Sequence, residues 1–361
     1  MKIFIITFHW ATNYGAVLQT YATQEFLEKL GHEVLVIDYV PKNYRVKFFN
    51  CFITRKLSNI RLNIIEYRKE KLLKRFRKKY LKLTKRYNSV KELNTENWGA
   101  YTYICGSDQI WNPYFTMNGE NGITLPYFLN FVPQTGKKIA YAVSFGVEKI
   151  SNEMKDAIQN EIKSFYNISV RENSGVKIIN DCGVDCQVVC DPVFLHNKTF
   201  YEQLISLKTH YNNGVFSYIL HNDENAISIV DNIISNYRFS KINCNEYCKL
   251  SEWLEYIHYS DLVITNSFHA TAMAVIFHTP FISVLIKGSG MNDRIITLLS
   301  QLGLDNRIVT ENNEQKIKEV LNNKIDWQEV DLKVNKMRSI GQEFLIFAIK
   351  EERGNKDVRD V

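Results

Sequence analysis

The sequence predicts an α/β protein of two domains, each built on a doubly wound parallel sheet. Short apolar runs alternate with helical patterns along almost the whole chain of 361 residues. Strands that are separated by helices form right-handed crossovers and therefore parallel sheets. The length suits two domains of roughly 150 residues each. With 45% hydrophobic and 23% charged residues, the composition excludes a disordered, collagen-like or coiled-coil chain.

The first domain is expected over residues 1–197. A helix over 15–30 ends at Gly31, where a left-handed C-cap favours glycine. Ser151 is a suitable N-cap for a helix that runs to about residue 165. Asp191 and Pro192 then break the chain after the last strand. The predicted strands of this domain are 2–8, 33–39, 100–105, 138–144, 168–171 and 187–190.

The second domain is expected over residues 198–330, followed by a helix in 331–361 that packs back on the first domain. Its strands are predicted at 214–220, 239–243, 261–265 and 281–285, with helices at 251–259, 269–277 and 292–302. In parallel sheets of this kind, ligands bind beyond the carboxyl ends of the strands. Two such sheets that face each other would place a cleft between the domains.

The apolar runs do not predict a membrane span. The longest run, 270–286, is interrupted by a histidine and a proline and is too broken for a span of about 20 apolar residues. The start, 1–8, lacks a small-residue cleavage site, so we expect a buried strand and a cytoplasmic protein with reduced cysteines. Cys182, Cys186 and Cys190 do not have the spacing of metal ligands, and no metal site is expected.

A strongly basic helical insertion interrupts the first domain at about 48–90. Over 55–86, fourteen Lys and Arg residues stand against Glu66 and Glu70, so this stretch carries +12; since the whole chain carries +6, the remainder carries −6. One interpretation is a solvated helix with one face on the core. The other is that residues 48–86 dock on an anionic membrane surface, at about 1 kcal/mol per cation. Nucleic acid is not expected as a partner, because no recognition motif is present.

Loops at the carboxyl ends of strands carry the candidate site residues. The loop after the first strand contains Asn13 and Tyr14 and opens a helix, so its backbone amides favour an anion or a polar sugar group. A plain tight turn is the alternative interpretation. The glycine pattern of a dinucleotide site is absent. We therefore expect these two residues to bind an acceptor.

A second loop places an aromatic ring beside hydrogen-bonding groups, namely Asp108, Gln109, Trp111 and Asn112. This combination suits a sugar, whose apolar face stacks on the ring while its hydroxyls form hydrogen bonds. Asp108 is also expected to accept a hydroxyl proton as a catalytic base. The alternative is a capped turn in which Asp108 bonds local amides.

Candidate donor-binding residues come from both domains. Arg171 ends a strand and could clamp a carboxylate or phosphate with two hydrogen bonds; the alternative is a structural ion pair with Glu172. His269 follows a buried strand and begins a helix, where the helix dipole and free amides attract phosphate. It could also move a proton. The loop over 286–294 brings Lys287 and Arg294 to the same rim.

Five motifs, taken together and in this order, resemble those of the polysaccharide pyruvyltransferase family over about residues 1–305. They are Asn13-Tyr14-Gly15-Ala16-Val17-Leu18-Gln19, Gly106-Ser107-Asp108-Gln109-Ile110-Trp111-Asn112, Ser169-Val170-Arg171-Glu172, Asp191-Pro192-Val193-Phe194 and Ser267-Phe268-His269-Ala270-Thr271. The resemblance implies a fold similar to the glycosyltransferase type B architecture. It also implies transfer of a carboxyethylidene group from phosphoenolpyruvate to two hydroxyls of one sugar, which gives a cyclic ketal.

The resemblance implies how the donor is held. In this family an arginine at the Arg171 position, a histidine at the His269 position and a downstream lysine bind phosphoenolpyruvate. For that lysine the candidate is Lys287, with Arg294 as its competitor. Many members carry an arginine where this chain has Ser267, so one expected cation is missing and Arg294 or Arg307 would have to replace it. The donor-binding set is therefore Arg171, Ser267, Phe268, His269, Lys287 and Arg294.

From these residues we expect a pyruvyltransferase of surface polysaccharide biosynthesis, such as that of a capsule or an exopolysaccharide. His269 would bind the phosphate and shuttle a proton, Arg171 would clamp the donor, and Asp108 would position or deprotonate the acceptor. Phosphoenolpyruvate is the donor substrate, and no cofactor is expected. Because acceptors in this family are often sugars on polyprenyl diphosphate, we expect a peripheral protein at the inner face of the cytoplasmic membrane.

Two other functions stay open at this point. A glycosyltransferase of the same architecture would use a nucleotide sugar and would need an acidic residue for the ribose, for which Asp293 is the candidate. A non-catalytic relative that binds polyanions through the basic helix is the other. The serine at position 267, where many family members carry an arginine, keeps the non-catalytic function open.

Overall fold

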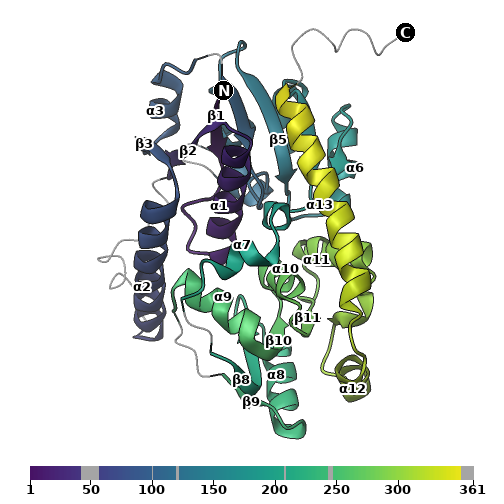
Figure 1. The fold of residues 1–361 in the computed structure, drawn as a ribbon. Helices are drawn as coiled ribbons and strands as arrows, with labels where there is room; N and C mark the ends of the chain where they lie inside the picture. Colours follow the sequence, from purple (N-terminus) through teal and green to yellow (C-terminus); the bar gives the residue numbers. More distant parts are fainter. Residues whose placement is uncertain (42–56, 100, 119–121, 207–208, 243–246, 351–361) are drawn as a thin grey trace.

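The computed structural model describes residues 1–41, 57–99, 101–118, 122–206, 209–242 and 247–350. Two parallel sheets form its framework, one above the other in Figure 1, and helices surround both. This arrangement confirms the predicted class of two doubly wound parallel sheets. Among the described residues, no helix is both long enough and apolar enough to cross a membrane.

The first sheet has seven parallel strands in the spatial order β3-β2-β1-β4-β5-β6-β7. From β1 to β3 successive strands are added in one direction, and from β4 to β7 they are added in the other, so the strand order reverses between β1 and β4. In open parallel sheets, ligands bind at such a reversal. The central strands are buried on both faces, which explains their continuous apolar runs. The strands are β1 (Lys2–Ile6), β2 (Glu33–Tyr39), β3 (Leu83–Tyr87), β4 (Thr102–Cys105), β5 (Lys137–Val143), β6 (Asn167–Val170) and β7 (Gln187–Val188).

The second sheet has five parallel strands in the order β12-β11-β10-β8-β9. Its strand order reverses between β8 and β10, and there the Asn266 side chain joins the two strand ends. Its Oδ1 accepts from the Leu220 amide at 2.7 Å, and its Nδ2 donates to the Leu220 carbonyl at 3.1 Å. The strands are β8 (Tyr211–Tyr218), β9 (Ser240–Lys241), β10 (Ser260–Thr265), β11 (Phe281–Val284) and β12 (Ile308–Val309).

Helices connect the strands of both sheets. In the first half they are α1 (Tyr14–Lys29), α2 (Leu57–Tyr80), α3 (Val90–Thr95), α4 (Pro113–Met117), α5 (Asn152–Lys163), α6 (Asn173–Asp181) and α7 (Lys198–Glu202), with 3-10 turns η3 (Pro126–Phe128) and η4 (Pro192–Leu195). In the second half they are α8 (Glu224–Asn236), α9 (Leu250–Tyr259), α10 (Phe268–Phe277), α11 (Asp293–Leu302), α12 (Glu314–Asn322) and α13 (Trp327–Lys350), with η5 (Gly290–Asn292) and η6 (Asp305–Arg307).

Two buried helices, α1 and the nearly apolar α10, lie in the core shared by the two sheets. Every residue of α10 is buried, and α1 is buried over almost its whole length. A helix that is apolar all round is stable in water only when neighbours cover every side. The two helices begin at the carboxyl ends of β1 and β10, so their first turns come together between the sheets.

The last helix, α13, spans both halves of the molecule and is drawn in yellow in Figure 1. Near its start, the Trp327 ring stacks on His278 with centroids 5.0 Å apart. In its middle, Arg338 donates from Nε to the Phe194 carbonyl at 2.8 Å. Toward its end, the Phe344 ring lies 6.0 Å from Tyr141 of β5. Polar and aromatic contacts of α13 therefore connect the second sheet to the first.

The basic insertion forms α2 and the edge strand β3. Its apolar stretch over 48–53 lies outside the described residues. Leu73 is fully buried, and the Phe76 ring packs edge-on against Tyr21 of α1 at 5.7 Å. Arg77 forms an ion pair with Glu70 on this inner side. One face of α2 is thus part of the core, as the first interpretation of the segment expected.

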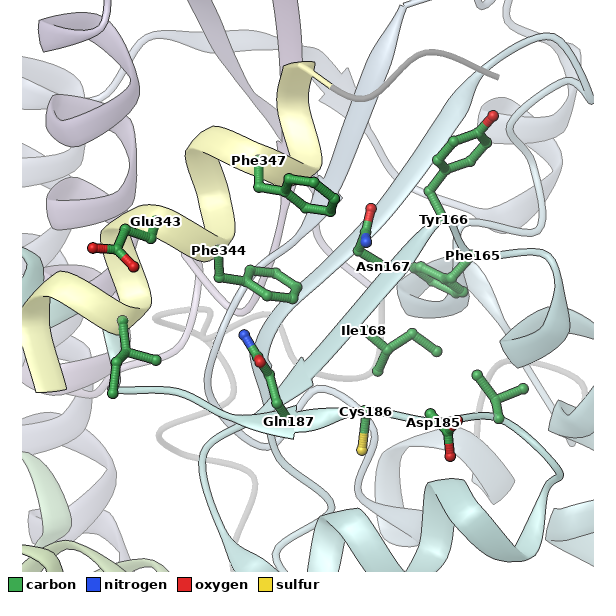
Figure 2. A pocket seen from close by; sticks show the side chains of 12 residues that line it. Phe165, Tyr166, Asn167, Ile168, Asp185, Cys186, Gln187, Glu343, Phe344 and Phe347 are labelled. Atoms are coloured by element: carbon green, nitrogen blue, oxygen red, sulfur yellow. The ribbon is translucent and has the colours of Figure 1, made fainter. Parts of the chain in front are cut away.

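A cavity of about 700 Å³ lies between α13 and the segments that lead into β6 and β7 (Figure 2). It is at the amino ends of these strands, opposite to the edge where ligands bind in such sheets. Its lining includes two carboxylates but no lysine, arginine or histidine, so it does not suit an anionic donor. The lining residues are Phe165, Tyr166, Asn167, Ile168, Val184, Asp185, Cys186, Gln187, Ile340, Glu343, Phe344 and Phe347.

Candidate active site

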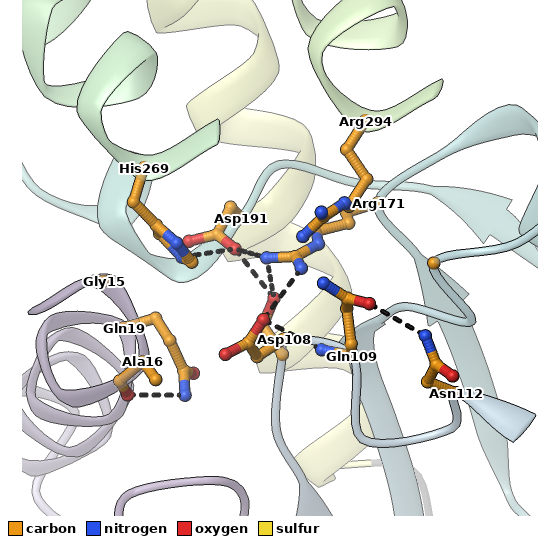
Figure 3. A network of polar contacts seen from close by, with 12 residues as sticks. Gly15, Ala16, Gln19, Asp108, Gln109, Asn112, Arg171, Asp191, His269 and Arg294 are labelled. Atoms are coloured by element: carbon orange, nitrogen blue, oxygen red, sulfur yellow. Dashed lines mark hydrogen bonds and ion pairs between the residues drawn. The ribbon is translucent and has the colours of Figure 1, made fainter. Parts of the chain in front are cut away.

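Two predicted donor-binding residues meet on one buried carboxylate at the carboxyl ends of the strands (Figure 3). Asp191 Oδ2 lies 2.6 Å from Arg171 Nη1 and 3.6 Å from His269 Nε2. The same oxygen accepts a hydrogen bond from Ser107 Oγ at 2.8 Å. Arg171 follows β6, whereas His269 belongs to α10 of the second half. The site therefore draws its nitrogen-bearing side chains from both halves of the chain.

Three carboxylates surround the Arg171 guanidinium, of which 1% is exposed. Besides Asp191, Asp108 Oδ1 lies 3.1 Å from Nη2, and Glu172 Oε2 lies 3.8 Å from Nε. A buried charge needs such partners to offset its lost hydration. Burial alone would lower the pKa of Arg171, but the charges of Asp191 and Asp108 outweigh it and raise that pKa. Arg171 is therefore a permanent cation at the centre of the site.

Asp191 is fully buried and stays ionised. Burial alone would raise its pKa, but the charge of His269, the hydrogen bond to His269 and the charge of Arg171 outweigh burial and hold the pKa of Asp191 well below its ordinary value. Its other oxygen accepts from the Val193 amide at 3.1 Å and so caps η4. The carboxylate is held by its own backbone and can orient both Arg171 and His269.

Asp108 is the member of this cluster closest to solvent, with 13% of its side chain exposed. Its backbone has a positive φ of 76°, a conformation that aspartate tolerates better than most residues. Oδ1 also accepts from the Gln109 amide at 2.9 Å. The local capping that was the alternative interpretation is present, and it points the carboxylate at Arg171. The Arg171 charge helps to hold the pKa of Asp108 below its usual range against the effect of burial.

His269 packs against the first turn of α1. Ser267 caps α10 by accepting from the Ala270 amide, and His269 is the second residue of that helix. A Cβ atom at Gly15 would lie 2.1 Å from both Cγ and Nδ1 of the imidazole. Asn13 caps α1 by accepting from the Gly15 and Ala16 amides. Glycine at position 15 is thus what allows the imidazole to reach Asp191.

Replacing Gly15 by alanine is expected to displace the His269 imidazole. Alanine favours helix over glycine by about 1 kcal/mol, so α1 itself is not weakened, while the added methyl overlaps the ring. Donor-dependent turnover should fall at least tenfold, as expected when a reacting group is misplaced by about 1 Å. Turnover and the His269 ring resonances in NMR spectra of the variant would measure this. Unchanged ring resonances together with unchanged turnover would contradict the contact.

Arg294 is the additional cation of the site. The Phe268 ring lies against both arginines, with its centroid 4.8 Å from Cζ of Arg171 and 6.0 Å from Cζ of Arg294. The terminal amide of Gln109 lies 3.1 Å from Nη2 of Arg294. Burial lowers the pKa of Arg294 to about 10, which still leaves it charged at neutral pH.

The other two candidate cations lie elsewhere. Lys287 is exposed in the loop after β11, and no contact within the described residues joins it to the Arg171 cluster. Arg307 donates to the carbonyls of Phe281, Val320 and Asn323 within the second half, so it supports that half structurally. Of the three candidate cations, Arg294 is the one that lies beside the Arg171 cluster.

Two aromatic residues expected to bind a sugar are buried in the packing. Trp111 is fully buried, stacks on Phe128 at 4.8 Å and donates from Nε1 to the Tyr127 carbonyl. Tyr14 stacks on Trp253 at 5.3 Å, and its hydroxyl donates to the Cys248 carbonyl at 2.9 Å. Neither ring face is open to a sugar in this structure, and we leave both out of the acceptor site.

The remaining acceptor candidates are partly exposed. Asn112 caps α4 with its Oδ1 and donates from Nδ2 to Gln109 Oε1 at 2.8 Å. Asn13 is likewise partly exposed while it caps α1. Asp108, Gln109 and Asn112 therefore form one polar edge beside Arg171 and Arg294 (Figure 3).

The sequence matches the model of one protein family, described as polysaccharide pyruvyl transferase, over residues 13–288. The chain belongs to the polysaccharide pyruvyl transferase family. The matched range includes Arg171, Asp191 and His269, whereas Arg294 lies beyond it. No curated protein matches the chain significantly.

Solved structures similar to this pyruvyl transferase family member show its fold alone, because their sequences differ widely from it. A putative UDP-N-acetylglucosamine 2-epimerase from Listeria monocytogenes has a TM-score of 0.55 and 10% identity, and the match covers 97% of this chain and 95% of that one. The S. aureus MnaA–UDP structure has a TM-score of 0.53 and 11% identity, with 97% and 96% covered. Both matches extend over nearly the full length of each protein.

Asp191 is the main site residue of this pyruvyl transferase family member that reasoning from the sequence did not assign. It was interpreted as a chain break because proline follows it. A signal was nonetheless present, since Asp191 is the first polar residue after the last strand of the first sheet, where site residues gather. Ser107 and Glu172 follow the ends of β4 and β6 in the same way. Glu172 Oε1 accepts from the Phe145 amide at 3.0 Å and so supports the loop after β5.

Proposed function

We propose that this protein transfers a carboxyethylidene group from phosphoenolpyruvate to two hydroxyls of one sugar, forming a cyclic ketal in surface polysaccharide biosynthesis. One observation carries the proposal: Arg171, His269 and Arg294 converge from both sheets beside Asp108 (Figure 3). A donor that bears a carboxylate and a phosphate needs several cations in one place. Membership of the pyruvyl transferase family supports the same reaction class.

The proposed reaction needs one acid and one base. A proton is added to the methylene carbon of the donor, which makes its central carbon electrophilic, and a sugar hydroxyl adds there. The bond to phosphate then breaks, and the second hydroxyl adds to the same carbon and closes the ring. Each hydroxyl loses its proton, so one proton replaces the one used at the methylene and the other is released. His269 would supply the first proton and Asp108 would accept one from the acceptor.

The ion pair between Arg171 and Asp108 suggests how donor and acceptor steps are linked. Asp191 is fully buried and held by Ser107 and Val193, so it would stay on Arg171 throughout. Asp108 is more exposed and is bonded to a single nitrogen of the guanidinium. A donor anion would take its place on Nη2, and the released carboxylate would then be available to a sugar hydroxyl. The donor carboxylate or phosphate would be clamped by Arg171 and Arg294.

Phosphate release in the presence of phosphoenolpyruvate and a sugar acceptor tests this proposal. We expect release only when both are present, with the ketal product detected by mass spectrometry. An Arg171→Lys variant is the matched control, because it keeps one positive charge but loses the fork that bonds two oxygens. Failure of the wild-type protein to release phosphate with any lipid-linked or soluble sugar would leave a non-catalytic relative as the better explanation.

A nucleotide-sugar glycosyltransferase is the competing enzymatic function. Its candidate ribose-binding acid, Asp293, accepts from the Ser174 amide at 2.9 Å and thereby joins α11 to α6. This carboxylate is occupied by a contact between the two halves. A thermal-shift screen separates the two donors: we expect stabilisation by phosphoenolpyruvate and none by nucleotide sugars. Stabilisation by nucleotide sugars alone would favour the glycosyltransferase.

The acceptor in this proposal is a sugar carried on polyprenyl diphosphate, and the protein would be peripheral at the inner face of the cytoplasmic membrane. The charge asymmetry between α2 and the rest of the chain supports this location. An exposed row of cations attracts an anionic leaflet within about a Debye length.

A further inference from the structure

Helix α2 presents one continuous basic face to solvent. It has 24 residues and is therefore about 36 Å long. Leu73 and Arg77 are buried and mark its inner side. Glu70 pairs with Arg77 on that side. Glu66 lies one turn before Glu70 and is exposed at the margin of the basic face. The outer face carries seven exposed cations, namely Arg61, Arg68, Lys71, Lys74, Arg75, Lys78 and Lys79.

Few carboxylates neutralise this face. After the helix, Lys82, Lys85 and Arg86 pair with Glu28, Glu96 and Asp38. By contrast, the described part of the chain offers no carboxylate ion pair to Lys71, Lys74, Arg75 or Lys78. Figure 1 shows α2 at the margin of the molecule, running beside both sheets. A row of like charges that repel one another along a helix is best satisfied by an extended anionic partner.

An apolar hollow lies beside the first turns of the same helix. A cavity of about 720 Å³ opens between α2 and the second half of the chain. Leu62 and Ile65 of α2 face Ile227 and Val230 of α8 across it, and Leu62 is 53% exposed. Arg61, Lys241 and the carboxylate Asp231 are also among its lining residues. Leu62 lies about three helical turns before the buried Leu73, so the hollow is on the inner side of α2 and is not part of the basic face.

The aromatic side chains of α2 distinguish a bilayer from a nucleic acid. Proteins that bind single strands expose aromatic rings on which bases stack. In α2, Phe76 and Tyr80 instead pack on Tyr21 of α1, with centroids 5.7 and 5.5 Å away. The remainder of the chain is acidic overall, which opposes wrapping by a polyanion. The chemistry of the face therefore matches lipid headgroups better than bases.

We propose that the outer face of α2 docks the protein on an anionic lipid bilayer. This inference deepens the proposed function and rests on it, because it names the surface that would bring the protein to a membrane that carries a lipid-linked acceptor. It depends on the exposed cations of α2 between Arg61 and Lys79. It can be measured without donor or acceptor, so its failure would leave the proposed transfer reaction untouched.

Co-sedimentation with vesicles tests the docking face on the full-length protein. We expect binding to vesicles of phosphatidylcholine with phosphatidylglycerol, strong loss of binding at high salt, and no binding to phosphatidylcholine alone. The triple variant Lys71→Glu, Lys74→Glu and Lys78→Glu should bind about 100-fold more weakly. A matched triple variant at exposed lysines away from α2, Lys177→Glu, Lys318→Glu and Lys324→Glu, should bind like the wild type.

Three further results keep the proposal open to refutation. Equal binding by both triple variants would mean that net charge alone attracts the vesicles, and it would overturn the assignment of the α2 face. Wild-type binding to a DNA duplex at concentrations where vesicles are not bound would also overturn it. Should the glutamate variant unfold, glutamine at the same three positions gives the same comparison. If the glutamine variant bound vesicles as tightly as the wild type, the proposal that the outer face of α2 binds the bilayer would be refuted.

Discussion

Replacing His269 by alanine is expected to lower turnover with phosphoenolpyruvate by a factor on the order of 10² or more, because proton transfer by a positioned side chain contributes at least that much. The imidazole is 6% exposed and lies against Asp191 and the backbone of Gly15. No other histidine is joined to the Arg171 cluster within the described residues. Steady-state phosphate release across pH 5–9 (roughly the range in which histidine titrates) is the measurement.

Two variants separate proton transfer from binding at this position. His269→Gln keeps a side chain that can donate a hydrogen bond. If the imidazole transfers the proton, this variant should bind phosphoenolpyruvate more tightly than His269→Ala but should turn over no faster. His210→Ala removes an exposed histidine and should leave both unchanged. If His269→Ala turned over at the wild-type rate, the assignment of His269 as the acid would fail.

Replacing Asp191 by asparagine is expected to reduce both stability and turnover. Removing one partner of a buried ion pair costs on the order of 3 kcal/mol, and Asp191 contacts both Arg171 and His269. Because Asp191 positions these two groups, we expect kcat to fall at least tenfold at temperatures where the variant is fully folded. Asp185→Asn, an exposed carboxylate six positions earlier, is the matched control and should change neither.

The pH dependence of unfolding gives a second readout for Asp191. Its pKa is depressed in the folded protein, so its stabilising contribution is complete above the unfolded pKa of about 3.9 and is lost as pH falls through the folded pKa. The wild-type protein should therefore lose stability steeply below about pH 4, and Asp191→Asn should lose less over the same interval. Glu172 and Asp108 are present in both proteins, so the difference between the two curves isolates Asp191. Parallel curves would contradict the bridging role.

The sequence predicted all the central strands of both sheets, together with the edge strands β7 and β9. β3 and β12 were not predicted, and both lie at the edge of a sheet. An edge strand needs no continuous apolar run, and β3 reads Leu-Thr-Lys-Arg-Tyr, which looks like part of the basic helix before it. Periodicity therefore identifies central strands more readily than edge strands.

The candidate site could be predicted from the rule for strand ends, but the direction of individual side chains could not. Arg171, Asp108 and His269 all follow central strands, so their proximity follows from topology. The positive φ of Asp108 turns the next residues back into the domain, and this is why Trp111 is buried under Phe128 while Gln109 stays near Arg294. A turn of this kind depends on backbone geometry that residue types alone do not specify.

The contact between Gly15 and His269 has a consequence for how such proteins can change. The first turn of α1 and the first turn of α10 fit each other without space for one methyl group, although about 250 positions of chain separate them. Halves taken from two distant relatives would thus assemble a competent centre only if both kept this fit. The absence of a Cβ atom at Gly15 therefore restricts recombination between the two halves. New specificities are more readily reached by changing the outer loops.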